Sequence, residues 1–150
     1  MQAANPYLMF DGNAEEAFAF YKSLFGGEFA VKVRFKDMGG GPPGATPAEL
    51  ERIAHVALPI GRDDVLMGSD IIPSLGHTLI VGNNFHLGLS PESSEEADRL
   101  FRGLSAGGTV LMEPRRTEWA EKHGMCVDRF GIQWMVTYTG SVRFAPGNAA

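Results

Sequence analysis

The amino-acid sequence predicts an α+β fold of two βαβββ modules that form a cupped mixed or antiparallel sheet. The first observation is an internal repeat, because NAEEAFAFYKSLFGG (13–27) returns as SSEEADRLFRGLSAGG (93–108). The second is that strand-like segments surround both copies in the same order. One four-stranded sheet with one helix leaves an apolar face uncovered, so two such modules are expected to pair.

Both copies of the repeat predict an amphipathic helix. Asn13 with Glu16, and Ser93 with Glu96, match the pattern in which a polar side chain caps the first helical turn. A glycine pair follows each copy and favours helix termination there. The predicted apolar stripes, at i, i+3, i+4 and i+7, are Ala17, Phe20, Tyr21 and Leu24 in the first copy and Ala97, Leu100, Phe101 and Leu104 in the second.

Strand-like segments define the predicted organisation of the chain. They are 6–10, 28–35, 52–60 and 64–70 in the first module, and 84–90, 109–114, 124–130 and 132–138 in the second. We therefore predict a first module at 1–70, a linker at 71–83, a second module at 84–140 and a mobile tail at 141–150. The Gly/Pro-rich loop 37–48 is long enough to act as a lid over a site, or to vary without consequence.

Composition narrows the expected partners. The formal net charge is -5 and no basic run stands out, which argues against nucleic acid as a partner. No apolar run approaches the roughly 20 residues of a membrane-spanning helix, and we expect a cytoplasmic protein without membrane contact. The single cysteine, Cys126, excludes an internal disulfide and is expected to be a buried, inert thiol.

Six segments resemble the vicinal oxygen chelate superfamily, which includes glyoxalase I, extradiol dioxygenases and bleomycin resistance proteins. They are YLMFDGNAEEAFAFYKSLFGGE, IAHVALPIG, LMGSD, NNFHLGLSPESSEEADRLFRGLSAGG, EWAEKHG and DRFGIQWMV. Within it they resemble the PhnB-like group, often labelled after 3-demethylubiquinone methyltransferase, although no glycine-rich nucleotide-binding turn follows a strand. The resemblance implies a homodimer with a small-molecule pocket.

The resemblance also locates the four positions that hold a divalent metal ion in many members of the superfamily. They fall on Pro6, Met67, His86 and Met135. Only His86 suits a hard or borderline ion, since proline has no donor side chain and thioethers prefer soft ions. We therefore expect no metal cofactor.

Three residues are candidates for proton transfer. His86 lies at a pocket position of the superfamily, and His55 and Asp70 match the PhnB-like pattern. Each has a structural alternative: His86 as a space-filling strand histidine, His55 as a core histidine of unknown facing, and Asp70 as a turn residue ordering the linker.

Strand alternation, combined with the resemblance, predicts the pocket lining. The expected ligand-binding residues are Leu8, Phe10, Met67, Ser69, His86, Trp119, Gln133 and Met135. Trp134 then points to the other side of its strand, into the core. A lining that is mostly apolar suits a small hydrophobic or aromatic molecule.

Three functions remain open at this point. One is a metal-free binding or sequestration protein, which the pocket lining favours. Another is a lyase, isomerase or dioxygenase type of enzyme with a rearranged metal or acid/base site. The last is a module that has lost its pocket, filled by Phe10, Met67 and Met135, and serves association.

Overall fold

The computed structural model describes residues 1–143, and these divide into two compact units, the first ending at Ile80 and the second beginning at Val81. The boundary lies within the segment predicted as a linker, 71–83. Ile71 at its beginning donates its N–H to the carbonyl oxygen of Phe10 at 2.7 Å, so this part belongs to the first unit. Of the predicted tail, 144–150 lies outside the described residues. Ser141 is held by the carboxylate of Glu121, which accepts its backbone N–H at 2.8 Å.

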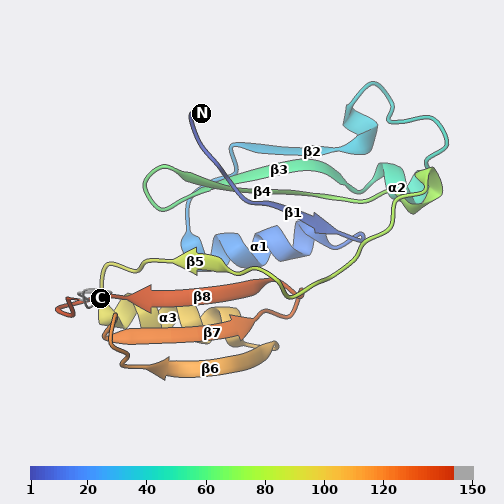
Figure 1. The fold of residues 1–150 in the computed structure, drawn as a ribbon. Coiled ribbons are helices and arrows are strands. Elements are labelled where there is room, and N and C mark those ends of the chain that lie inside the picture. Colours follow the sequence, from blue (N-terminus) through green and yellow to red (C-terminus); the bar gives the residue numbers. More distant parts are fainter. Residues whose placement is uncertain (144–150) are drawn as a thin grey trace. The chain divides into compact units, whose positions relative to one another are not determined.

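The first unit is a mixed four-stranded sheet with one long helix (Figure 1). Its elements are β1 (Tyr7–Phe10), α1 (Ala14–Phe25), β2 (Val31–Arg34), η1 (Phe35–Asp37), α2 (Pro47–Leu50), β3 (Ile53–Ile60), β4 (Asp64–Asp70) and η2 (Pro73–Leu75). The strand order is β1-β4-β3-β2, with β1 parallel to β4 and the other pairs antiparallel.

The second unit repeats this topology. Its elements are β5 (Leu87–Leu89), α3 (Ser94–Ser105), β6 (Thr109–Arg115), β7 (Lys122–Val127) and β8 (Gln133–Tyr138). The strand order is β5-β8-β7-β6, and only β5 and β8 pair in parallel. The predicted duplication of a βαβββ module is therefore confirmed, although the segment predicted as a strand at 84–90 is regular only over the three residues of β5.

The two long helices bury one face each. In α3 the buried residues are the predicted stripe of Ala97, Leu100, Phe101 and Leu104, whereas in α1 they are Ala14, Ala17, Phe18 and Tyr21. The α1 prediction is thus wrong in including Phe20 and Leu24, which are only half-buried, and in omitting Ala14 and Phe18. Phe18 packs onto Gly68 of β4, where an added Cβ would lie 2.7 Å from the Phe18 ring. Among residues 1–143, neither these helices nor any other could span a bilayer.

The helix starts differ between the units. Ser93 caps α3 as predicted, accepting the Glu96 N–H at 3.0 Å. Asn13 makes no side-chain cap on α1, which corrects the prediction. The carboxylate of Asp70, at the end of β4, takes this place by accepting the N–H groups of Gly12 at 2.9 Å and Ala14 at 3.0 Å. A residue distant in sequence therefore replaces the expected local cap.

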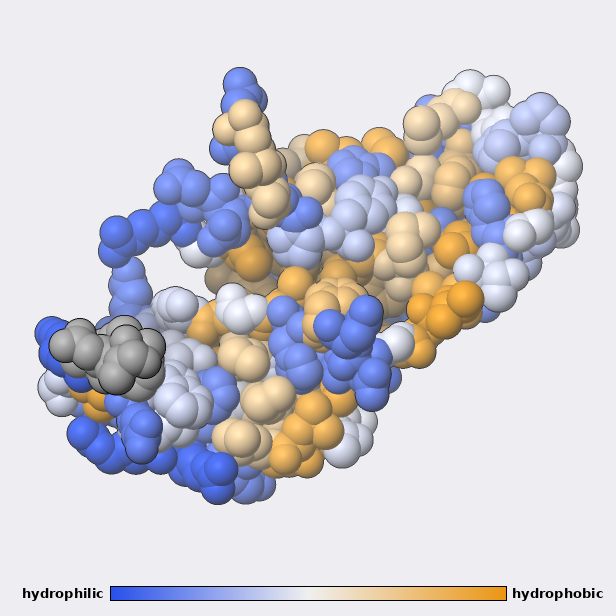
Figure 2. All heavy atoms as spheres, viewed as in Figure 1, coloured by the Kyte–Doolittle hydropathy of each residue, from blue (hydrophilic) through white to orange (hydrophobic). Residues whose placement is uncertain are grey.

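Apolar side chains also reach the surface at the edge of the second sheet. Val110 and Leu111 of the edge strand β6 are 41% and 51% exposed. Figure 2 shows apolar surface over this strand, with polar surface beside it. Pro114 and two register irregularities interrupt β6, and such features discourage the addition of another strand.

The loop predicted as a possible lid contains α2 and is tied to the segment after β4. Glu49 of α2 is buried, and its carboxylate accepts the N–H of Thr46 at 2.8 Å and the N–H of Ser74 at 3.0 Å. Thr46 in turn accepts the Glu49 N–H at 3.2 Å, which completes a capping box. These bonds anchor the end of the loop at α2 and η2.

The hydrogen bonds of the Glu49 carboxylate predict how the stability of the fold depends on pH. The Thr46 N–H and then the Ser74 groups lower the pKa of Glu49 below its ordinary 4.5. A lowered pKa stabilises the fold above pH 4.5, and this contribution disappears as the pH falls through the folded-state value. Glu49→Gln should therefore lower the urea midpoint at neutral pH, and the difference from the wild type should shrink under acid.

Urea titrations from pH 7 to pH 3, followed by circular dichroism, measure this difference. Glu51→Gln removes the same charge from an exposed side chain and is the matched control. A difference for Glu49→Gln that stays constant across this range would contradict the assigned role of the carboxylate.

Candidate ligand-binding faces

Each sheet has one face covered by its own helix and a second face, turned away from that helix, which we call its open face. Residues directly opposite each other on neighbouring strands project to the same face. The register aligns Tyr7, Met67, Ala57 and Val31 in one row across β1, β4, β3 and β2. In the neighbouring row, Met9 is paired with Ser69, and His55 with Val33. These residues form the open face of the first sheet.

His55 is on this open face, which settles the facing that the sequence left undetermined. Its Nδ1 lies 3.0 Å from the hydroxyl of Tyr7, and the two rings stack at 5.6 Å between centroids. Ser69 lies beside them and donates to the sulfur of Met9 at 3.5 Å. The result is a mostly apolar surface with one paired imidazole and phenol.

Leu8 and Phe10 do not share this face, so their predicted orientation is wrong. Leu8 pairs with Gly68, which packs against α1, and both Leu8 and Phe10 are buried. The Phe10 ring makes an edge-on contact with Phe18 of α1 at 6.1 Å. Both side chains belong to the core, and Phe10 does not fill the open face.

Asp70 is also on the α1 side of its sheet. Besides the two N–H groups at the start of α1, its carboxylate accepts the N–H of Ile53 on β3 at 2.9 Å. It is 3% exposed. A buried carboxylate that accepts three backbone N–H groups has a structural role. This role is not the predicted turn at the linker, because the three bonds join α1 to β3.

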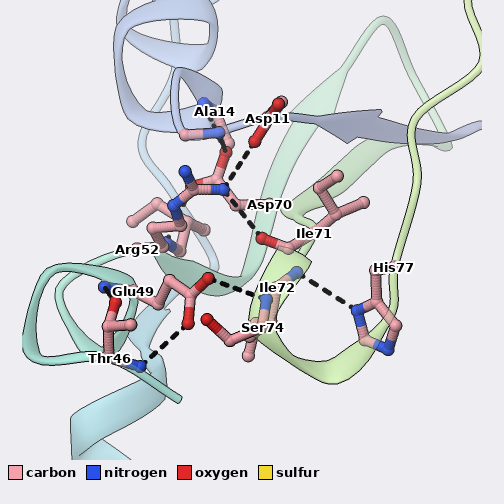
Figure 3. A network of polar contacts seen from close by, with 12 residues as sticks. Asp11, Ala14, Thr46, Glu49, Arg52, Asp70, Ile71, Ile72, Ser74 and His77 are labelled. Carbon is pink, nitrogen blue, oxygen red and sulfur yellow. Dashed lines mark hydrogen bonds and ion pairs between the residues drawn. The ribbon is translucent and has the colours of Figure 1, made fainter.

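An open cleft of about 510 Å³ lies in the first unit at the start of α1. It is lined by Asp11, Gly12, Asn13, Glu15, Arg34, Ala48, Glu51, Arg52, Ile53 and Asp70. Arg52 pairs with Asp11 at 2.8 Å, as Figure 3 shows, and Arg34 pairs with Glu15 at 2.6 Å. Because these charges neutralise one another, we place the candidate site on the open faces instead.

The open face of the second sheet consists of three rows that cross its strands. The first row contains Arg115, His123 and Thr137, the second Met112, Met125, Met135 and Gly88, and the third Thr109, Val127 and Gln133. An added Cβ on Gly88 would meet no atom within 4 Å, so the methionine row ends beside open space. Met135 and Gln133 share a face, as strand alternation predicts.

His86 precedes β5, next to the third row. Its Nε2 is buried and has no hydrogen-bond partner among residues 1–143. Gln133 is engaged nearby, since its amide donates to the carbonyl oxygen of Phe85 at 2.7 Å. A buried nitrogen without a partner costs stability, and a hydrogen bond to a ligand or a water molecule would recover that cost.

His123 and Arg115, in the first row, were not among the predicted residues. His123 Nδ1 lies 2.9 Å from the hydroxyl of Thr137, and its ring meets the exposed Trp119 edge-on at 5.5 Å. Burial, and then the positive charge of Arg115, lower the pKa of His123. The imidazole is therefore neutral at pH 7.

The helix side of the second sheet holds the residues expected in the core. Trp134 is fully buried and donates its indole N–H to Asp128 at 2.8 Å. Cys126, its neighbour on β7, is also fully buried, and burial together with Asp128 raises its thiol pKa to about 11. A thiol with this pKa is inert as a nucleophile at neutral pH.

The residues at the expected metal positions do not fit a divalent ion of the zinc, manganese or iron type. Met67 and Met135 present thioethers on the two open faces, and Pro6 offers only its carbonyl oxygen, which accepts the Met67 N–H at 3.2 Å. Within the described part of either unit, no three His, Cys, Asp or Glu side chains gather as a metal site.

A family model agrees with this architecture. The model described as Glyoxalase/Bleomycin resistance protein/Dioxygenase superfamily matches residues 3–136. The match covers all eight strands except the last residues of β8.

Individual relatives are similar over nearly their whole length. Protein YjdN of Escherichia coli (strain K12) is 34% identical over 139 residues, which are 88% of this chain and 92% of that protein. The structure of PA1353 from Pseudomonas aeruginosa has a TM-score of 0.81 at 35% identity, covering 92% of this chain and 98% of that one. The PhnB protein of Bacillus cereus gives 0.73 at 28% identity, covering 91% and 99%. The predicted resemblance is confirmed.

Proposed function

Because the chain belongs to the Glyoxalase/Bleomycin resistance protein/Dioxygenase superfamily, in its PhnB-like group, we propose that it binds a small apolar or aromatic molecule without a divalent metal ion. The role would be retention or sequestration of that molecule. The observation that carries the proposal is the methionine row of the second open face, Met112, Met125 and Met135, beside the space over Gly88.

Methionine side chains suit such a role for physical reasons. They are unbranched and polarisable, so they adapt to ligands of different outline and make favourable contacts with aromatic rings. A row of three across adjacent strands gives a continuous apolar floor. Ligand sites of this kind are mostly apolar, with few polar groups that fix orientation.

Polar groups at one end of this floor can orient the ligand. The buried Nε2 of His86 has no partner in the described chain and is the strongest candidate to bond a ligand oxygen or nitrogen. Gln133 lies in the neighbouring row. On the first sheet, Ser69 and Met67 offer a similar combination of one hydroxyl and one thioether.

A panel of planar aromatic compounds, screened by thermal unfolding and then by calorimetry, tests this proposal. We expect at least one compound to raise the melting temperature, and EDTA to leave that rise unchanged because no metal ion takes part. Met135→Glu should weaken binding more than tenfold, since it places a charge in the apolar row. A panel without any binder, or a rise that EDTA abolishes, would contradict the proposal.

The matched control is Met38→Glu. Met38 follows η1 in the first unit and is 61% exposed, so its replacement introduces the same charge at a residue that belongs to neither sheet. Its ligand affinity should equal that of the wild type. Equal losses in both variants would show that charge alone, and not the methionine row, governs binding.

A second candidate is proton-transfer catalysis on the first open face. The Tyr7 hydroxyl lies 3.0 Å from His55 Nδ1, a distance suited to moving a proton between phenol and imidazole. Mass spectrometry of any bound compound after incubation separates the two functions. Recovery of the unchanged compound supports binding alone, and a converted product that disappears in Tyr7→Phe supports catalysis.

A further inference from the structure

The first row of the second open face contains charged and polar side chains that the binding of an apolar molecule does not require. Arg115 of β6 is directly opposite His123 of β7, and His123 contacts Thr137 of β8. Trp119, in the connection from β6 to β7, is 44% exposed and meets the His123 ring edge-on. One cation and two aromatic rings therefore gather beside the methionine row, at its β6 and β7 side.

The Arg115 guanidinium has no polar partner within the described part of its own unit. Its side chain is exposed, and no ion pair or hydrogen bond of its guanidinium occurs among residues 1–143. Most basic residues of strands elsewhere are paired, as Lys122 is with Asp98 and Lys32 with Glu15. In a chain with a net charge of -5, an unpaired guanidinium beside a neutral histidine is a local anion site.

The distance between the rows determines how far Arg115 lies from the methionine row. On β7 and β8 the two rows are two residues apart, or about 7 Å, and the irregularity in β6 places Arg115, three residues after Met112, in the same pair of rows. A two-ring aromatic acid spans this distance, with its rings over the methionines and its acid group at Arg115. Arginine binds a carboxylate through two parallel N–H bonds, which fixes orientation as well as charge.

We propose that the ligand of the second open face is a planar aromatic carboxylate, with its acid group bound by Arg115 and its rings on Met112, Met125 and Met135 against Trp119. The inference rests on the proposed binding function and names the class of its ligand. His123 contributes as a neutral wall of the site, held in place by Thr137. Sulfur–aromatic contacts stabilise the rings, and the guanidinium supplies selectivity.

The test compares 2-naphthoate with its neutral counterpart 2-naphthamide by calorimetry. We expect the wild type to bind the carboxylate at least tenfold more tightly than the amide. Arg115→Gln should remove this preference, and Arg115→Lys should keep only part of it. Quenching of Trp119 fluorescence, absent in Trp119→Phe, should accompany binding, while the buried Trp134 should not respond.

Arg102→Gln is the matched control, because Arg102 lies on α3, which covers the opposite face of the same sheet. The same change in net charge there should leave the preference intact. An equal effect of the two variants would overturn the assignment of Arg115. Equal affinity of the wild type for both compounds would overturn the carboxylate inference alone, and absence of any binding would overturn the proposed function with it.

Discussion

Replacing Asp70 by alanine should destabilise the first unit by about 3–5 kcal/mol, because three backbone donors, two of them buried, lose a charged acceptor at once. Two of these donors, Gly12 and Ala14, begin α1, and the third, Ile53, begins β3. The variant therefore loses the cap of α1 and the link between the helix and the sheet together. Urea denaturation followed by circular dichroism measures the loss.

Amide hydrogen exchange identifies the cause. In Asp70→Ala, protection should fall most at Gly12, Ala14 and Ile53. The control is Asp11→Ala, which removes an exposed carboxylate 2.8 Å from Arg52 and should cost less than about 1 kcal/mol. A similar cost for both variants would mean that the Asp70 bonds do not hold α1 to the sheet.

The architecture could be predicted from the sequence because its signals are local. The helix of the second unit is defined by its own cap at Ser93 and its own apolar stripe, and both were predicted. The cap of α1 was missed because its acceptor, Asp70, is 56 residues from Ala14 in the chain. No local pattern around Asn13 indicates a hydrogen bond to a residue so distant in the sequence.

The candidate site was predictable only where one face of a strand is chemically distinct. In β8, Trp134 and Val136 alternate with Gln133 and Met135. The resemblance placed Met135 at the pocket, and alternation then placed Trp134 on the opposite side. In β1 all four residues, Tyr7 to Phe10, are apolar or aromatic, so no alternation indicates which pair faces α1. Leu8 and Phe10 were therefore assigned to the wrong face.

Arg115 and His123 escaped prediction for a different reason. The strand β7 begins at Lys122, two residues earlier than the predicted 124, so His123 was not counted as a strand residue. The register between β6 and β7 shifts between Val110 and Met112 and again before Arg115. Counting along β6 therefore does not place Arg115 opposite His123, because an irregularity changes the partner of every later residue.

Replacing Trp134 by alanine should destabilise the second unit by about 3–5 kcal/mol, the range for removing a buried aromatic side chain. Trp134 is fully buried on β8, opposite Cys126 of β7, and its indole N–H donates to Asp128. Trp134→Phe should cost less, about 1–3 kcal/mol, since the ring remains and Asp128 loses only one of its donors. Asp128 keeps the N–H groups of Phe130 and Ile132, at 2.8 and 3.0 Å.

Trp119 is the control that distinguishes a core residue from a ligand-binding residue. Trp119→Ala removes a side chain that is 44% exposed, so the free energy of unfolding should change by less than about 1 kcal/mol while 2-naphthoate binding is lost. Trp134→Phe should show the reverse, with reduced stability and unchanged affinity at a temperature where it is folded. If both variants lost stability equally, Trp119 would belong to the core. Because Trp134 is buried on β8 and Trp119 is exposed in the connection from β6 to β7, the two replacements should have opposite effects.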